Sequence, residues 1–437
     1  MQAKELKSRV RASTSALSER IDALVADWLK PLLANIDRGC LPEFRPKQVN
    51  DPIWGTIELL PWEVALLDTN LLQRMRGVRQ LGLAQLVFPS ASYDRLEHII
   101  GTVGAVEETL RALSRQIERW NRDTRDSPLP SVSDKDRYAI RLAALLHDIG
   151  HGPFSHAIEP VMQTDAALPS SESDSPAPDW RDELNTLQFL LKDLYQLNAS
   201  PSVSEAIAVM MVLSPSLTKV LASDAIFTER GRPAEELQVI IVAAIIGAVD
   251  GPGASHLSAL ISSQIDADKL DYLARDAYHA GLEIGFDTSR LLARLELLAV
   301  RADNLDDGLV DLRKRASESP DGRFYQIGIA AAGFGSFEQM LIGRTFLYDR
   351  LYHHHKVRAA EATAQRLILV AQRDRKRRFE LDEIFLGVAD DTFLGCGAIF
   401  ADSDAMWLAF RYDQAASTAL QISGAVVPTA LNLLSAN

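Results

Sequence analysis

The chain has few cysteines and no segment long and apolar enough to cross a membrane. Its 437 residues include only Cys40 and Cys396, which form neither a CxxC metal motif nor a disulfide framework. This composition is typical of a reducing compartment, and we expect a cytoplasmic protein without a membrane partner. The N-terminus lacks the apolar segment of a signal peptide. The longest apolar run, Val239 to Val249, is too short to span a bilayer and predicts a buried core helix.

Positive charge is also in deficit. Lys and Arg total 46 against 59 Asp and Glu, which gives a net charge of −13. This balance argues against a protein whose main task is to hold a nucleic-acid backbone, so we do not expect single-stranded nucleic acid as a partner. A phosphate-bearing substrate remains compatible with the charge, because it needs only a local cluster of Arg, Lys and His.

Helical periodicity dominates the rest of the sequence. With 47% hydrophobic residues the chain can bury a large core. Apolar residues spaced by three or four predict helices within residues 5–36, 61–80, 94–121, 183–249 and 335–372. Ser133 begins a capping box for a helix that ends at His147. Short extended pieces near Asp51 and at Arg323–Ile329 predict a small β element. We therefore predict a mostly α fold with a small β element and a C-terminal helical region.

One stretch, from Leu145 to Glu159, concentrates polar chemistry. It reads Leu-Leu-His-Asp-Ile-Gly-His-Gly-Pro-Phe-Ser-His-Ala-Ile-Glu and holds three of the nine histidines of the chain. An apolar helical run delivers the adjacent His147 and Asp148, and the chain then turns through two glycines and a proline. A capped helix end is the alternative interpretation. Imidazole and carboxylate groups are good ligands for divalent transition metals, so we favour a metal-centred reaction site.

A stable metal site needs further ligands from elsewhere in the chain. His98 lies in a helical pattern, one turn after Arg95 and on the same face. A second helical segment places Asp268, Tyr272 and Asp276 at spacings of four. A stripe of acid, phenol and acid on an otherwise apolar helix is difficult to explain as core. We expect both segments to face the site.

The ordered set His98, His147-Asp148 and Asp268 resembles the H…HD…D signature of the HD-domain phosphohydrolases. It resembles most the deoxynucleoside triphosphate triphosphohydrolases within that superfamily. The similarity extends over roughly residues 50–365. The matching segments are Asp51-Pro-Ile-x-Gly-x-Ile-Glu58, Gln73-Arg-Met-Arg-x-x-Arg-Gln-Leu-Gly82, Val87-Phe-Pro-x-Ala91, Arg95-Leu-Glu-His98, His147-Asp-Ile-Gly-His-Gly-Pro-Phe-Ser-His156, Asp268-Lys-Leu-Asp-Tyr-Leu-Ala-Arg-Asp276 and Arg358-Ala-Ala-Glu361.

The resemblance implies an HD-domain helical core with one divalent transition metal, held by His98, His147, Asp148 and Asp268. It also implies hydrolysis of a deoxynucleoside triphosphate (dNTP) at the α-phosphorus, which releases the deoxynucleoside and intact triphosphate. The metal is Fe, Mn, Zn, Co or Ni, because a set of two histidines and two aspartates serves several ions. An additional Mg or Mn ion that accompanies the substrate phosphates is a further expectation.

Two histidines are candidates for the proton donor to the leaving 5′-oxygen, since imidazole titrates near neutral pH. By similarity His151 is the first choice, oriented by Glu159. His156 resembles the second phosphate-contacting histidine of the family. Capping of the turn is the alternative role for either histidine.

The resemblance also assigns residues to the polyphosphate of the substrate. Extra positive charge should surround it, because the transition state spreads negative charge over its oxygens. Arg95 and Lys269 adjoin metal ligands in sequence and suit that role, with surface ion pairing as the alternative. Arg350 lies in a later helix that contributes phosphate contacts in relatives.

Four residues are expected to meet the sugar. Tyr272 and Asp276 match sugar-contacting positions of the family, and Tyr352 follows in the later helix. A tyrosine ring beneath the sugar would hinder a 2′-hydroxyl and so select deoxynucleotides. Either Asp276 or Gln80 is expected to sense the 3′-hydroxyl.

Three positions depart from the family pattern. Asp182 stands where relatives carry a relay histidine, which leaves His151 with Glu159 as the simpler arrangement. Trp54 replaces a histidine and puts any substrate or regulatory contact there in doubt. The run His353–His355 departs from the usual spacing. We interpret it as a polar surface or a phosphate edge, with a second metal site as the alternative.

We divide the chain into three parts: an N-terminal helical extension (1–46), an HD core (47–297) and a C-terminal region that completes the substrate pocket (298–437). Residues 164–179, rich in Ser, Pro, Ala and Asp, predict a mobile insert within the core. By resemblance we expect a homo-oligomer and a nucleotide effector.

Two alternatives to dNTP hydrolysis remain open. One is another HD-type hydrolase, such as a nucleotidase or phosphodiesterase. The other is a regulator that binds nucleotides or nucleic acid and has weak activity.

Overall fold

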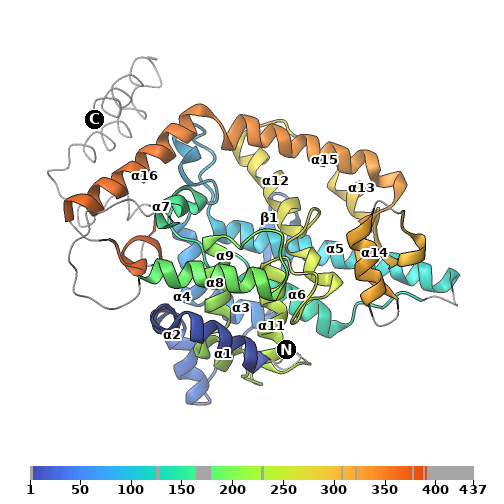
Figure 1. Cartoon of the computed structure of the whole chain (residues 1–437), viewed down its shortest axis with the longest axis horizontal. Coiled ribbons are helices and arrows are strands. Elements are labelled where there is room, and N and C mark those ends of the chain that lie inside the picture. Colours follow the sequence, from blue (N-terminus) through green and yellow to red (C-terminus); the bar gives the residue numbers. More distant parts are fainter. Residues whose placement is uncertain are drawn as a thin grey trace.

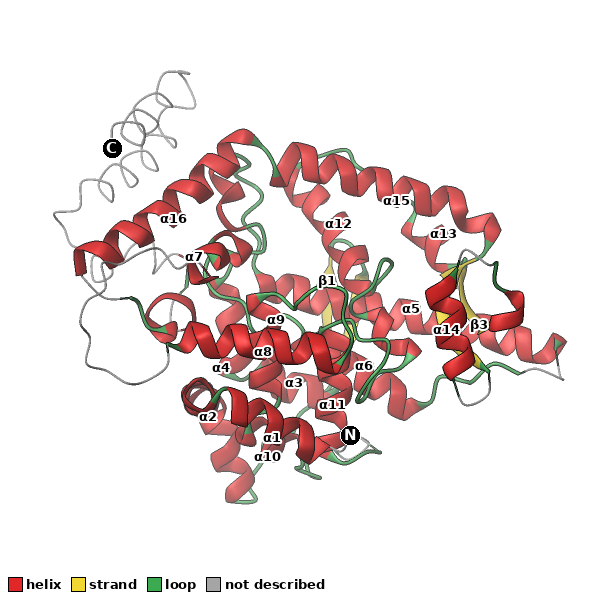
Figure 2. Ribbon diagram, viewed as in Figure 1, coloured by secondary structure: helices red, strands yellow, loops and turns green. Residues whose placement is uncertain are grey.

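The computed structural model of the chain describes residues 3–390 except 125–127, 164–178, 228–230, 307–308, 320–321, 376–377 and 387–388. The described part is mostly helical with two small two-stranded sheets (Figure 2), which confirms the predicted fold class. The predicted mobile insert lies outside the described residues apart from Asp179, and so do residues 391–437 of the predicted C-terminal region. The division of the chain into three parts stays a prediction.

The helices account for most of the predicted periodic stretches. Those of the first part of the chain are α1 (Ala3–Ser13), α2 (Ser15–Asp37), α3 (Pro61–Leu67), α4 (Asn70–Gln73), α5 (Arg95–Asp123), α6 (Asp134–Leu146), α7 (Glu159–Gln163), α8 (Trp180–Leu194), α9 (Val203–Val212), α10 (Pro215–Leu221) and α11 (Ala234–Ile245). The later helices are α12 (Ala267–Ala280), α13 (Thr288–Leu292), α14 (Val310–Glu318), α15 (Phe334–Leu347) and α16 (His355–Arg375).

Two antiparallel two-stranded sheets form the β structure of the described residues, and the first of them is a hairpin. Strand β1 (Lys47–Asp51) pairs with β2 (Gly55–Leu59), in a register that sets Asp51 opposite Gly55. Strand β3 (Leu295–Arg301) pairs with β4 (Arg323–Ile329), which confirms the predicted strand at 323–329. The first hairpin contacts helix α5, so the loop between β1 and β2 lies near the middle of the molecule.

Helix α5 is the central element of the core. It packs against α6, α12 and β3, and α11 packs against the opposite side of α6. Local chemistry sets where these helices begin: Asp94 accepts a hydrogen bond from the backbone N–H of Glu97 at 2.9 Å, and Ser133 forms the predicted capping box with Asp136. The apolar run from Val239 belongs to α11, which is buried as predicted.

The N-terminal helices pack on this core, as their periodicity predicts. Leu6 on α1 and Ile21 on α2 are fully buried. Glu183 on α8 accepts hydrogen bonds from the backbone N–H groups of Ala16 and Leu17, at 3.3 and 2.7 Å. These two bonds satisfy donors that the first turn of α2 would otherwise leave unpaired.

The predicted helix at 335–372 is interrupted in the structure. Helix α15 ends at Leu347, a π-helical turn covers Tyr348–Tyr352, and α16 begins at His355. Figure 1 shows α15 and α16 along one edge of the molecule, above α12. A π turn inserts an extra residue and so changes the face on which later side chains lie.

No single described helix is long and apolar enough to cross a membrane. The bent pair α9 and α10 meets the requirement only when the two helices are taken together, by length and composition.

Candidate metal centre and nucleotide site

His147 and Asp148 stand directly after helix α6. The ring of His147 donates from Nδ1 to the carbonyl oxygen of Ala144, 2.8 Å away. This bond uses the proton on Nδ1, so the lone pair of the neutral ring is on Nε2. Ile140 and Ala143 are buried on the same helix and hold it against the core, as the sequence predicts.

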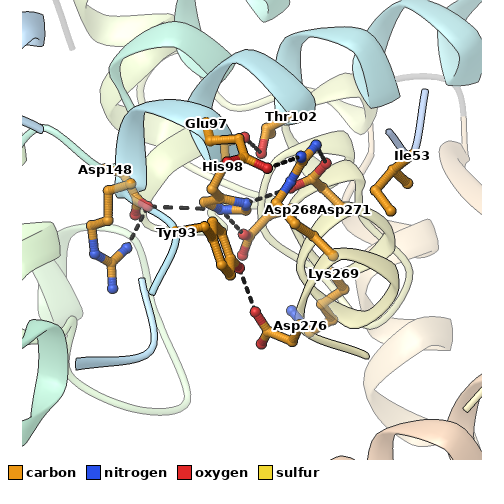
Figure 3. A network of polar contacts seen from close by, with 12 residues as sticks. Ile53, Tyr93, Glu97, His98, Thr102, Asp148, Asp268, Lys269, Asp271 and Asp276 are labelled. Atoms are coloured by element: carbon orange, nitrogen blue, oxygen red, sulfur yellow. Dashed lines mark hydrogen bonds and ion pairs between the residues drawn. The ribbon is translucent and has the colours of Figure 1, made fainter. Parts of the chain in front are cut away.

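Three carboxylates surround the fully buried ring of His98 on α5 (Figure 3). Its Nε2 lies 2.9 Å from Oδ1 of Asp268 and 3.7 Å from Oδ2 of Asp148, and its Nδ1 lies 2.7 Å from Oδ2 of Asp271. Burial lowers the pKa of His98, but the adjacent carboxylates of Asp268 and Asp271 outweigh burial and raise it to about 10. The carboxylates therefore favour positive charge at this point.

The four predicted metal ligands converge on that point. Nε2 of His147 lies 3.5 Å from Oδ1 of Asp148 and 3.7 Å from Oδ1 of Asp268. Nε2 of both His98 and His147 is buried without a hydrogen-bond partner among the described residues. Buried imidazole lone pairs that face carboxylates repel them unless a proton or a cation lies between. His98, His147 and Asp148 form a cluster that could hold a metal ion, and Asp268 adds a carboxylate oxygen near both imidazoles. Two imidazoles and two carboxylates suit one divalent metal ion.

Asp271, which the sequence analysis did not single out, supports His98 from behind. Its carboxylate accepts hydrogen bonds from Nδ1 of His98, from Nε and Nη2 of Arg275 at 2.9 and 2.7 Å, and from Nε1 of Trp54 at 2.7 Å. Arg275 is fully buried and also pairs with Asp51 at 2.8 Å. A carboxylate behind a ligating histidine fixes the tautomer of the ring. The spacing of four between Asp271 and Arg275 on one helix is the sequence signal that was available.

His151 and His156 both face Glu159. His151 is buried, with Nε2 3.2 Å from Oδ1 of Asp148 and Nδ1 3.9 Å from Oε1 of Glu159. The side chain of His156 is 66% exposed, and its Nδ1 lies 3.2 Å from the same Glu159 oxygen. Burial and the charge of Arg95 lower the pKa of His151 to about 3. Burial raises the pKa of Glu159, but its contacts with His156 and His151 outweigh burial and lower it to about 2.

The turn between these histidines is held by specific contacts. Phe154 and Ser155 adopt left-handed conformations, with φ of 56° and 55°, which are uncommon for residues other than glycine. The hydroxyl of Ser155 donates to the carbonyl oxygen of Arg79 at 2.6 Å and accepts from Nε of Arg95 at 3.0 Å. Gly150 is needed for space, because a Cβ atom there would lie 1.9 Å from the carbonyl oxygen of Ser204.

The three cations predicted for the polyphosphate occupy different environments. Arg95 is buried and donates to the carboxylate of Asp148, so it is not a surface ion pair. Lys269 donates from Nζ to Oδ2 of Asp266 at 2.7 Å, on the helix that carries Asp268. The side chain of Arg350 is 67% exposed, and its Nε lies 3.3 Å from Oδ2 of Asp349. The structure thus brings Arg95 to the ligand cluster and leaves Arg350 on the surface.

Arg344 on α15 is a cation that the sequence analysis passed over. Its guanidinium lies over the ring of Tyr348, 5.3 Å from the centroid. A hydrogen bond to Tyr348 is the main cause that raises the pKa of Arg344, and Tyr272 adds a further hydrogen bond. Its charge also acts on Lys269 and opposes the rise that Asp266 and Asp268 cause in the pKa of that lysine. Helical periodicity alone does not separate Arg344 from Arg350, because Arg344 lies on α15 and Arg350 lies inside the π turn that follows it.

The residues predicted for the sugar gather around Asp276. Its two carboxylate oxygens accept hydrogen bonds from the hydroxyls of Tyr93 and Tyr352, and Figure 3 shows Tyr93 directed at Asp276. Burial raises the pKa of Asp276 to about 6. The backbone N–H of Gln80 donates to the carbonyl oxygen of Tyr93 at 3.1 Å, and Oε1 of Gln80 is buried without a described partner. Tyr272 lies one turn before Asp276 on α12. Tyr93 is the member of this group that the sequence analysis missed.

The departures from the family pattern can now be placed. The side chain of Asp182 is exposed on α8, so it does not stand in for a relay histidine. Trp54 donates to Asp271 and thus supports the ligand cluster. His353 and His355 are exposed, and the run from His353 to His355 forms no cluster of three metal-binding donors in the described part of the chain.

Comparison with known proteins matches part of this site to a known domain. The family model of the HD domain matches residues 95–209, which include His98, His147 and Asp148. The SAMHD1 deoxynucleoside triphosphate triphosphohydrolase of Danio rerio is 30% identical over 259 residues, which cover 56% of this chain and 36% of that protein. Its Homo sapiens counterpart is 28% identical over 321 residues, 70% of this chain and 42% of that protein.

A bacterial protein shows a similar relationship. The uncharacterized protein YwfO of Bacillus subtilis is 27% identical over 326 residues, which cover 74% of this chain and 55% of YwfO. The chain therefore matches between about a third and a little over half of the length of these relatives. The remainder of each relative lies outside the match.

Proposed function

The chain carries an HD domain and is related to the SAMHD1 deoxynucleoside triphosphate triphosphohydrolases, and from this premise we propose that it hydrolyses dNTPs. The products are a deoxynucleoside and inorganic triphosphate. The observation that carries the proposal is the convergence of two buried imidazole lone pairs and two carboxylates from His98, His147, Asp148 and Asp268.

These four residues would hold one divalent ion, of Fe, Mn, Zn, Co or Ni. Bound there, the ion would polarise a phosphate oxygen and lower the pKa of a bound water. An additional Mg or Mn ion would accompany the substrate phosphates. His98 and His147 are already oriented for this task, because Asp271 and the carbonyl oxygen of Ala144 hold their Nδ1 atoms.

We assign donation of the proton to His156, with Glu159 as the residue that orients it. A proton donor must reach the leaving oxygen of the substrate. His156 is exposed and is held by Glu159 through Nδ1, which leaves Nε2 available to the substrate. His151, the first choice from the sequence, is buried and directs Nε2 at Asp148.

The chemical step balances with these groups. A water oxygen forms a bond to the α-phosphorus, and the bond between that phosphorus and the 5′-oxygen breaks. The 5′-oxygen takes a proton from the charged form of His156 and leaves as the hydroxyl of the deoxynucleoside. The attacking water gives up a proton, which restores His156. Arg95, next to Asp148, stabilises negative charge that develops on the triphosphate.

The substrate would lie between this cluster and helix α15. Lys269 on α12 and Arg344 on α15 would provide positive charge for the polyphosphate. Asp276, with Tyr352, and Tyr272 one turn away provide the surface for the sugar. A ring beneath the sugar disfavours a 2′-hydroxyl, which supports a deoxynucleotide over a ribonucleotide.

A substrate panel tests the proposal. The purified protein is incubated with divalent metal and each of the four dNTPs, the four NTPs, nucleoside monophosphates and cyclic nucleotides, and the products are identified by mass. We expect triphosphate from at least one dNTP, and loss of that activity in His147→Ala. Turnover of monophosphates or cyclic nucleotides alone would instead support another HD-type hydrolase. Homo-oligomerisation, a nucleotide effector and a cytoplasmic location stay predictions.

A further inference from the structure

A second cluster of metal-binding groups lies next to the His98–Asp268 centre. His151, His156 and Glu159 each offer a donor atom, and these three atoms lie within 4.8 Å of one another. Nδ1 of His156 and Nδ1 of His151 lie 3.2 and 3.9 Å from the same oxygen of Glu159. Two imidazoles and one carboxylate are a donor set that zinc accepts while it keeps an open fourth position.

We propose that His151, His156 and Glu159 form a second site for a divalent transition ion such as Zn²⁺, separate from the His98–Asp268 centre, and that its occupation blocks the proton donor. Zinc binds nitrogen and oxygen at about 2.0–2.2 Å, so tetrahedral ligand atoms stand about 3.3 Å apart. The two distances to the Glu159 oxygen bracket that value. Small side-chain rotations would complete the geometry.

An unpaired buried nitrogen points into the second cluster. His151 is 5% exposed, and its Nδ1 has no hydrogen-bond partner among the described residues. Buried polar atoms nearly always have a partner, so the unpaired nitrogen indicates a position where a ligand binds. The other nitrogen of the same ring, Nε2, is already directed at Asp148, 3.2 Å away. Nδ1 therefore remains free for an ion on the Glu159 side.

The surroundings of Glu159 support coordination. Ser204 on α9 gives its carboxylate a further hydrogen bond, and ligating carboxylates are commonly held in this way. The exposed ring of His156 provides an entry path from solvent, whereas the other two ligands are buried. A metal at this position would replace the proton shared by His156 and Glu159.

The functional consequence rests on the proposed function. Coordination through Nδ1 of His156 would occupy Glu159 and place a positive ion beside the ring, so that His156 no longer carries the proton for the 5′-oxygen. General acid catalysis contributes about 10²–10⁴-fold to rate, and we expect a loss of about 100-fold when the second ion is bound. The ion thus acts as an inhibitor that leaves the first centre intact.

Metal stoichiometry tests the site without any substrate. The wild-type protein and its variants are dialysed to equilibrium against buffered Zn²⁺, and bound zinc is measured by elemental analysis. We expect two ions per chain in wild type, and one in both His156→Gln and Asp268→Asn. Loss of a residue that only orients a metal ligand costs about 10–100-fold in metal affinity. Loss of the ligand His156 itself should therefore lower the zinc affinity of the second site by at least about 100-fold.

His353→Gln is the matched control, because His353 is exposed and lies in the histidine run outside the cluster. It should retain two ions. One ion in wild type, two ions of unchanged affinity in His156→Gln, or loss of the second ion in His353→Gln would each overturn the proposed site. The single ion expected in His156→Gln also shows that this variant is folded around the first centre.

The zinc concentration that inhibits the enzyme is then compared with the zinc affinity of the second site. The free Zn²⁺ concentration that halves dNTP hydrolysis should equal the dissociation constant of the second ion. Unchanged or increased activity when the second ion binds would overturn the inhibitory role. If no dNTP is hydrolysed at all, the proposed function fails, while the stoichiometry of the variants still decides whether the second site exists.

Discussion

Replacement of Asp271 by Asn should weaken metal binding although Asp271 is not one of the four converging ligands. The carboxylate accepts the proton of His98 Nδ1 at 2.7 Å and thereby keeps Nε2 unprotonated on the metal side. An Asn side chain is uncharged, and its NH₂ group can turn towards the ring. Loss of such a partner costs 10–100-fold in metal affinity, about 1.4–2.7 kcal/mol.

Asp271→Asn should also destabilise the fold. Asp271 and Arg275 are both fully buried, and removal of one partner from a buried ion pair costs about 3–5 kcal/mol. Arg275 keeps Asp51 at 2.8 Å and Glu97 at 2.9 Å, so we expect the low end of this range. Urea unfolding of the metal-depleted protein measures this cost separately from metal binding.

Glu97→Gln is the matched control for this experiment. Glu97 pairs with the same Arg275 and with His279 at 2.9 Å, but it makes no described contact with the ring of His98. It should lose stability and keep its metal affinity. Both affinities are measured by competition with a chelator of known affinity. Unchanged affinity in Asp271→Asn, or an equal loss in Glu97→Gln, would refute the idea that Asp271 positions His98.

Two further predictions concern stability. Burial raises the pKa of Asp276 from 3.8 to about 6. Its contribution to the unfolding free energy should therefore fall by about 2 kcal/mol between pH 4.5 and pH 7.5, at about 1.4 kcal/mol per pKa unit. The unfolding free energy of Asp276→Asn, measured with urea at pH 4.5 and 7.5, should lack this fall. If wild type and variant lose the same stability between the two pH values, the raised pKa of Asp276 is contradicted. Gly150→Ala should cost about 3 kcal/mol or more, because its Cβ would lie 1.9 Å from the backbone oxygen of Ser204, whereas Gly335→Ala meets nothing within 4 Å. Equal thermal midpoints for the two glycine variants would contradict the packing around Gly150.

Much of the ligand cluster was predictable from the sequence because its chemistry is local. The adjacent His147 and Asp148 follow an apolar helix whose start, Ser133, is marked by a capping box. His98 and Asp268 lie near the starts of α5 and α12, on faces that the spacing of polar residues indicates. Each of these signals needs only a few turns of chain, which is the range over which periodicity is informative.

The support behind His98 was not predictable, because it depends on contacts between distant segments. Trp54 and Asp271 are 217 residues apart in sequence and meet at 2.7 Å. Trp54 looked like a departure from a family contact, and its hydrogen bond to Asp271 appears only after the first hairpin has packed on α5. Tertiary contacts of this kind leave no local pattern in a single sequence.

The relative roles of His151 and His156 depend on exposure, which the sequence does not give. Both lie in the same turn and both face Glu159, yet one is buried and the other is 66% exposed. The choice between Arg344 and Arg350 depends on the π turn, because Arg344 precedes that turn on α15 and Arg350 lies inside it. Regular periodicity cannot anticipate an inserted residue.

Hydrolysis in ¹⁸O-labelled water tests the central claim most directly. The metal-loaded protein is incubated with a dNTP that the panel identifies as a substrate, and both products are analysed by mass spectrometry. Attack at the α-phosphorus predicts one ¹⁸O atom in inorganic triphosphate and none in the deoxynucleoside. Labelled orthophosphate or pyrophosphate, released together with a deoxynucleoside di- or monophosphate, would contradict the account.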